Sequence, residues 1–189
     1  MSKIAHEASS AQRVAGMPFN GVVMKIHDNC SELYRRGDWK ALHSVLDNAS
    51  PGRDSDERSQ IGRWRASALS AEGRHEEAID ALRGIQSECR CRATVSKHIA
   101  ENLRRLGRDM EAIEELKNAP LAEERDRFSG LVLDAKYVLA HLLASNGLEV
   151  NKAILDDIPD SYVHITDRGQ RISKADLVDM ISGKKKSSI

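Results

Sequence analysis

The fold of this chain is decided by three stretches that share one pattern: LYRRGDWKALHSVL (Leu33–Leu46), LSAEGRHEEAIDAL (Leu69–Leu82) and LRRLGRDMEAIEEL (Leu103–Leu116). In each stretch a leucine lies four residues before a glycine, an apolar residue lies five after it, and a leucine lies nine after it. The glycines are Gly37, Gly73 and Gly107, so the repeats are 36 and 34 residues apart. A glycine at the end of a helix takes the left-handed conformation that closes it. The period therefore predicts stacked helix–turn–helix repeats.

Helical spacing of apolar residues extends this pattern in both directions. We expect helix pairs over about 21–50, 60–90, 92–120 and 128–158, with an exposed linker between the first two. The fourth pair comprises a helix over 128–146, a turn at Gly147 and a short helix over 150–156. Gly147 lies 40 residues after Gly107, and an insertion between 120 and 127 would account for the longer spacing.

The two ends of the chain lack the repeat pattern. Residues 1–20 are rich in Ser and Ala, and we predict a flexible leader. In the segment 159–189, Tyr162–Thr166 alternates and is β-branched, which predicts a short hairpin-like element or an extended strand. Ser173 followed by Asp176 is typical of a helix N-terminus, so we expect a helix over 175–182 that caps the repeats. A basic run, Lys184–Lys186, ends the segment.

Composition places few limits on function. Lys plus Arg equals Asp plus Glu at 29 each, so net charge gives no reason to propose a nucleic acid or a membrane as partner. Three cysteines form no disulfide framework, and the N-terminus lacks the apolar core of a signal peptide. No apolar run is long enough to span a bilayer. The sequence therefore predicts an all-α, cytoplasmic protein.

The repeat resembles the tetratricopeptide repeat, a helix–turn–helix unit with small residues at fixed positions. The best matches in register are Ala66, Leu69, Gly73, Ala78 and Leu82 in the second repeat, and Ala100, Leu103, Gly107, Ala112 and Leu116 in the third. The first repeat departs with Leu42 where the others have alanine, and in the fourth Ala153 is one residue out of register. The resemblance implies a short right-handed α-solenoid with a concave groove. An unrelated bundle of antiparallel helices is the alternative.

In tetratricopeptide proteins the first helix of each repeat lines the groove, which typically holds a peptide or an extended protein segment. Counting back from each glycine gives these candidate groove residues: Tyr34, Arg63, Trp64, Lys97, His98, Arg104, Arg105, Tyr137 and His141. We expect Trp64 and Tyr137 to act as apolar anchors, with packing in the core as the alternative for Trp64. The family's carboxylate clamp pairs Lys with Asn one turn later. Here Glu101 follows Lys97, so the clamp is not reproduced.

Charge is divided between the two helices of each central repeat. The first helices carry an excess of basic residues, net +2 over 60–71 and net +3 over 92–106. The second helices are acidic, net −2 over 75–86 and net −3 over 109–118. If the first helices line the groove, its wall is basic and suits an acidic segment or a terminal carboxylate. Solvation of exposed helix faces is the plain alternative.

Motifs for catalysis or metal binding are absent from the sequence. There is no glycine-rich phosphate loop, nucleophile elbow or HExxH pair. Cys89 and Cys91 point to different faces of a helix or turn, which argues against a metal site. We therefore expect a non-enzymatic adaptor or chaperone without cofactor or metal, which binds an acidic protein or peptide. The alternatives are a self-assembling structural protein and, less favoured, a regulatory nucleic-acid-binding protein.

Overall fold

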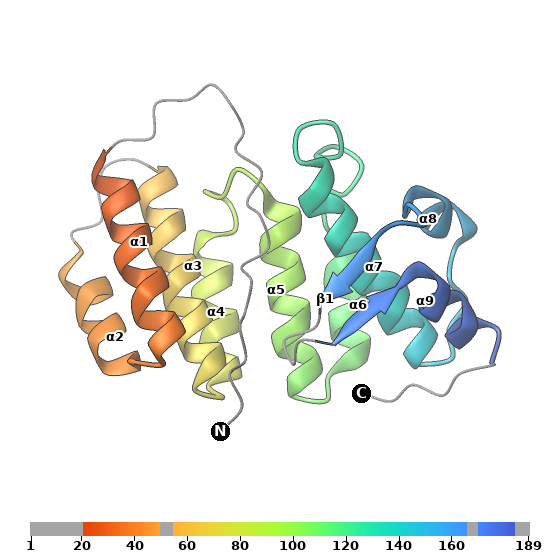
Figure 1. Cartoon of the computed structure of the whole chain (residues 1–189), viewed down its shortest axis with the longest axis horizontal. Coiled ribbons are helices and arrows are strands. Elements are labelled where there is room, and N and C mark those ends of the chain that lie inside the picture. The colour runs from red at the N-terminus through yellow and green to blue at the C-terminus, as the bar shows by residue number, and fades with distance from the viewer. Residues whose placement is uncertain (1–20, 50–54, 166–169, 184–189) are drawn as a thin grey trace.

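The computed structural model describes residues 21–49, 55–165 and 170–183, and these ranges are mainly helical. Four helix pairs follow one another, and a two-stranded antiparallel sheet and a last helix complete the fold (Figure 1). The elements are α1 (Gly21–Arg36), α2 (Trp39–Asn48), α3 (Ser55–Ala71), α4 (His75–Ile85), α5 (Arg92–Arg105), α6 (Asp109–Lys117), α7 (Ser129–Ser145), α8 (Lys152–Asp157), β1 (Val163–Ile165), β2 (Arg171–Ser173) and α9 (Lys174–Ile181). The predicted all-α class is confirmed, and the small sheet lies where the sequence predicts a hairpin-like element or strand.

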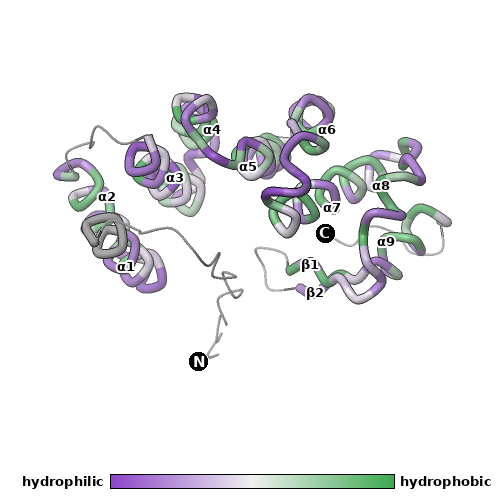
Figure 2. Tube along the Cα trace, turned by 90° about the horizontal axis from the view of Figure 1, so that it is seen from above, coloured by the Kyte–Doolittle hydropathy of each residue, from purple (hydrophilic) through white to green (hydrophobic). Residues whose placement is uncertain are grey.

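The paired helices lie in two curved rows. Figure 2 shows α2, α4, α6 and α8 along one side and α1, α3, α5 and α7 along the other. The sheet of β1 and β2 lies on the side of the odd-numbered helices, near α7. We refer to the odd-numbered helices as the inner row and to the even-numbered helices as the outer row.

The turn within each pair has the same hydrogen-bonded geometry, which explains the leucine–glycine spacing. Gly37, Gly73, Gly107 and Gly147 all have positive φ, between 67° and 79°. The residue after each glycine donates its N–H to the carbonyl of the leucine four residues before the glycine, over 2.9–3.0 Å. This is the Schellman arrangement, which satisfies carbonyls at the helix end. The fourth pair shares this turn although its sequence departs most from the pattern.

The residue five positions after the glycine lies where the helices cross. Leu42, Ala78 and Ala112 occupy this position in the first three pairs, and each has 0% of its surface exposed. In the fourth pair the out-of-register Ala153 is exposed, and α8 contains no buried residue. Its Ile154 and Leu155 are partly buried and pack against the main core, and Lys136 and Arg125 form ion pairs with its Asp157.

Helix α3 begins earlier than the sequence predicts. It starts at Ser55 rather than near Gln60, so part of the predicted linker is helical. Asp56 and Glu57 lie in its first turn, where acidic side chains interact favourably with the helix dipole. The predicted leader 1–20, the start of the linker, and the basic run Lys184–Lys186 lie outside the described residues.

The insertion between the third and fourth pairs has a structural role. Its buried Glu124 accepts hydrogen bonds from the backbone N–H groups of Arg92 and Ala93, both at 3.0 Å. These N–H groups lie in the first turn of α5, where a helix has no internal acceptors. Glu124 therefore caps α5 from a segment about thirty residues further along the chain.

The C-terminal segment folds back on α7. The antiparallel pairing joins Val163 to Ser173 and Ile165 to Arg171. Ser173 then caps α9 in a reciprocal capping box with Asp176, as the sequence predicts. Leu177 of α9 is fully buried in the main core, which also includes the buried face of α7. None of the helices in the described ranges is both long and apolar enough to cross a membrane.

Candidate functional site

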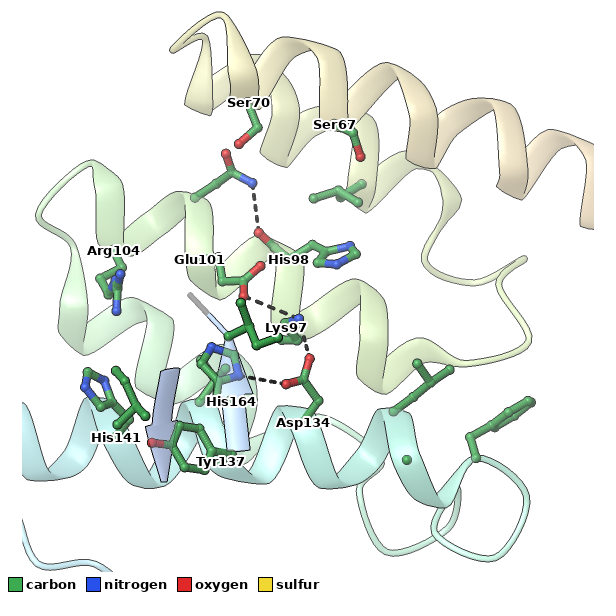
Figure 3. Close-up of a pocket in the computed structure, with 18 of the residues that line it drawn as sticks. Ser67, Ser70, Lys97, His98, Glu101, Arg104, Asp134, Tyr137, His141 and His164 are labelled. Atoms are coloured by element: carbon green, nitrogen blue, oxygen red, sulfur yellow. Dashed lines mark hydrogen bonds and ion pairs between the residues drawn. The ribbon is translucent and has the colours of Figure 1, made fainter. Parts of the chain in front are cut away.

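A cavity of about 950 Å³ lies between α3, α5, α7 and the β1–β2 sheet. It is open to the inner side of the helix rows, and Figure 3 shows the side chains around it. Its lining includes seven of the nine candidate residues from the sequence: Tyr34, Lys97, His98, Arg104, Arg105, Tyr137 and His141. These residues come from three helix pairs. The spacing from glycine predicts that they share one groove, and in the structure they line one cavity.

Arg63 and Trp64 do not line this cavity, which corrects their assignment to it. Trp64 packs against the core of the first helix pair, with its ring centroid 5.5 Å from that of His27 and 6.0 Å from that of Tyr34. Arg63 donates through Nη2 to Gln60 at 3.0 Å, along its own helix. Trp64 therefore follows the alternative of a core residue and is not an anchor in the cavity.

Lys97 lines the cavity but is not an available cation. Its ammonium group forms ion pairs with Asp134 of α7 and, at 3.4 Å, with Glu101 of α5. Only 14% of its side-chain surface is exposed. Burial opposes the charged form, but the two carboxylates outweigh it and raise the pKa of Lys97. The expected basic wall is thus neutralised at this point.

Asp134 is the centre of a hydrogen-bond network that joins α5, α7 and the C-terminal segment. Besides Lys97 it accepts hydrogen bonds from the Tyr162 hydroxyl at 2.7 Å and from His164 Nδ1 at 2.9 Å (Figure 3). Burial alone would raise the pKa of Asp134, but the donors from His164, Lys97 and Tyr162 lower it well below its usual range. We call Asp134, Lys97, Glu101, Tyr162 and His164 the Asp134 network.

Asp134, Tyr162 and His164 are site residues that the sequence reasoning missed. Asp134 lies one helical turn before Tyr137 and Val138, so the same count from Gly147 places it on the groove face. It is an isolated acid on a helix that is apolar on nearly all sides, which indicates a partnered carboxylate. Tyr162 and His164 are two residues apart at β1 and therefore share a face, but their return to α7 has no signal in the sequence.

The opposite end of the cavity contains buried polar atoms without partners. Tyr137 is 1% exposed and His141 is 5% exposed, one helical turn apart on α7. Among the described residues, neither the Tyr137 hydroxyl nor His141 Nε2 has a hydrogen-bond partner. Arg104, in the last turn of α5, also lines the cavity, and Figure 3 draws it across from His141 at the same end of the cavity. We call Arg104, Tyr137 and His141 the open corner.

The electrostatics of the open corner are set by burial and by positive charge. Burial first, and then Arg104 and His164, lower the pKa of His141 to about 4. Burial is also the main cause that raises the pKa of the Tyr137 hydroxyl, with a smaller contribution from Asp176. Both side chains are therefore neutral near pH 7. The Tyr137 ring stacks on His164, with centroids 4.9 Å apart and an angle of 19° between the rings.

The remaining predicted residues lie further along the cavity. Tyr34 is partly exposed, and its ring contacts Trp39 with centroids 5.2 Å apart. His98 is half-buried, and burial is the main cause that lowers its pKa. Arg105 is exposed next to Arg104. These side chains extend the cavity from the open corner towards the first two helix pairs.

The side chains around the cavity offer charged groups and hydrogen-bonding groups to a ligand. Within the part of the chain that the structure describes, no three His, Cys, Asp or Glu side chains are grouped as they would be to hold a metal ion. The cysteines Cys30, Cys89 and Cys91 are free, buried and away from the cavity. The residues that could contact a ligand are the donors of the open corner and the exposed arginine beside it.

Comparison with protein-family models, with curated proteins and with solved structures gives no match to this chain. Its function is therefore inferred from the cavity and from the arrangement of the helices around it.

Proposed function

We propose that this chain is a non-enzymatic protein-binding module, an adaptor or chaperone, that holds an acidic, extended protein segment against its inner row of helices. In this proposal the helix pairs form a short solenoid of tetratricopeptide type. The four equivalent glycine turns and the two rows of helices support this assignment. Solenoids of this kind present a continuous inner surface rather than a catalytic cleft.

The observation that carries the proposal is the position of the cavity. It lies on the inner row, spans α3, α5 and α7, and is lined by seven residues selected from the repeat spacing alone. Its volume of about 950 Å³ is at the upper end of the range for pockets that hold small organic ligands. Several residues of an extended peptide would fill such a space more completely than a small metabolite.

The charge of the bound segment follows from the cations that are not neutralised. Lys97 is paired within the Asp134 network, so the charge argument rests on Arg104 at the end of α5. Arg104 lines the cavity without an ion pair to any described residue. A buried or half-buried arginine without a carboxylate is stabilised when a ligand supplies one.

The experiment that tests this function is affinity capture from native lysate with three proteins. These are the wild-type chain, the variant Arg104→Glu and the control Arg83→Glu, which makes the same change at an exposed arginine in the last turn of α4, outside the cavity. We expect a protein retained by the wild type and by the control and lost by Arg104→Glu, with an acidic segment that binds as a peptide. Identical retention by all three, or self-association alone, would contradict the proposal and favour a structural oligomer.

A further inference from the structure

The open corner differs from every other polar group in the cavity in that its buried atoms lack partners. A buried donor or acceptor without a partner is destabilising relative to one that is hydrogen-bonded. His141 Nε2 and the Tyr137 hydroxyl both carry this cost, although both side chains are more than nine-tenths buried. A chain selected for stability alone would place apolar side chains here, as it does at Val138 and Leu142 on the same helix.

Positive charge at the same corner comes from Arg104, and the acid that acts there, Asp176, is engaged in the capping box of α9. Arg104 and His164 are the charged or titratable groups that act on His141, and His164 is already bound to Asp134. The acid that acts on Tyr137 is Asp176 of α9, whose Oδ2 accepts hydrogen bonds from Ser173 N and Oγ at 2.9 and 2.6 Å. Among the residues described at this end of the cavity, the Arg104 guanidinium is a cation that forms no ion pair.

We infer that the open corner is a subsite for a single carboxylate group, in which the Arg104 guanidinium supplies the charge and His141 Nε2–H donates a hydrogen bond. A carboxylate has two oxygens and one negative charge, which matches one arginine and one neutral histidine. A phosphate dianion would need more positive charge than this corner holds. The inference deepens the proposed function and rests on it, because it names the group of the bound segment that the cavity recognises.

A carboxylate could come from a protein segment or from a small organic acid, and acetate is the probe that both share. The protein is labelled on its histidine side chains, and the ring signals of His141 and His164 are followed by NMR at pH 7 during titration with sodium acetate. Acetamide has the same size without the charge and is the matched ligand control. Chloride keeps the ionic strength constant.

The expected result is a saturable shift of the His141 signal with acetate and at least tenfold weaker binding of acetamide. The His164 signal should move less, since Asp134 already occupies its Nδ1. Arg104→Gln should weaken acetate binding at least tenfold, whereas Arg83→Gln should leave it unchanged. Circular dichroism and thermal melting of each variant verify that the fold is retained. A linear drift of both histidines, or binding that Arg104→Gln does not alter, would overturn the inference.

A second experiment distinguishes a carboxylate on a protein from one on a small organic acid. It also distinguishes failure of the subsite from failure of the proposed function. A pool of random hexapeptides is passed over the immobilised protein in free-acid and C-terminally amidated forms. Preferential retention of the free acids, lost in Arg104→Gln, would assign the subsite to a protein terminus. Saturable acetate binding with equal retention of both pools would support the subsite for an acidic side chain or a small organic acid. Capture of an Arg104-dependent client without acetate binding would preserve the proposed function and reject the subsite.

Discussion

The two ends of the cavity are built from similar residues but in opposite ways. In the Asp134 network both carboxylate oxygens of Asp134 have partners, and three elements are joined through this one carboxylate. In the open corner, less than two helical turns away on α7, a tyrosine and a histidine are more deeply buried, and one polar atom of each has no partner among the described residues. Satisfied polar networks hold a structure together, whereas unsatisfied buried groups reduce stability and indicate a site kept for a ligand. We therefore propose that one half of the cavity is structural and the other half binds a ligand.

The largest expected effect tests the helix arrangement on which both ends depend. Ala112 is fully buried, so Ala112→Glu should place a charge in a tight helix crossing and lower the free energy of unfolding by about 3 kcal/mol or more. Met110→Glu, on the same helix but 61% exposed, is the control and should change it little. Urea denaturation measures both. Equal, small losses would show that the register of α6 is wrong.

The next largest effect is expected from a substitution that disrupts the Asp134 network. Asp134→Asn keeps the shape of the side chain but removes the charge that Lys97 and His164 share. We expect a loss of about 2 kcal/mol in the free energy of unfolding, since hydrogen bonds to charged groups contribute about 1.5–3 kcal/mol. The C-terminal segment should also become more accessible to proteolysis, because Tyr162 and His164 bind this residue. Unchanged stability would mean that the network does not hold the segment.

The pH dependence of stability tests the open corner. The pKa of His141 is about 4 in the folded chain and about 6.5 in an unfolded one, so the unfolded state binds more protons between these values. The histidine's contribution therefore becomes unfavourable as the pH falls through 6.5, by up to about 2 kcal/mol at pH 5. His141→Leu should remove this part of the decline. If wild type and variant lose stability in parallel between pH 7 and pH 5, His141 does not titrate as described.

The smallest effect is a matched pair of substitutions. Tyr162→Phe removes a hydroxyl that donates to Asp134, and should lower the free energy of unfolding by about 1–2 kcal/mol. Tyr137→Phe removes a hydroxyl without a partner, and should leave the stability unchanged or raise it by up to about 1 kcal/mol. Thermal melting of the two variants side by side makes the comparison. The opposite order would reverse the assignment of the two ends.

The features that could be predicted from sequence are those set by local spacing. The glycine turns, the helix pairs, the capping box of α9 and the alanines of the helix crossings follow from residues within a few positions of one another. Counting back from each glycine also predicts a shared groove face for Lys97, Arg104, Tyr137 and His141, and all four line one cavity.

What could not be predicted depends on contacts between distant segments. The sequence suggests Lys97 as a groove cation. It does not reveal that Asp134 neutralises this charge, because Asp134 lies 37 residues away on another helix. Trp64 has the spacing of a groove residue, but the first helix pair supplies an aromatic cluster that it joins. Tyr162 and His164 contact α7 through tertiary packing and through hydrogen bonds to Asp134, and no local sequence pattern encodes these contacts.

The central claim is that the open corner recognises a carboxylate within a protein-binding groove, and a double-mutant cycle tests it most directly. The peptide carboxylate that occupies the subsite, at the C-terminus or on a side chain of the best-retained peptide, is prepared as the acid and as the amide. The affinity of each form for the wild type and for Arg104→Gln is measured by calorimetry. We predict that amidation weakens binding to the wild type at least tenfold and binding to Arg104→Gln by less than twofold. Amidation that weakens binding to both proteins equally would contradict the account, because the carboxylate would then be recognised elsewhere.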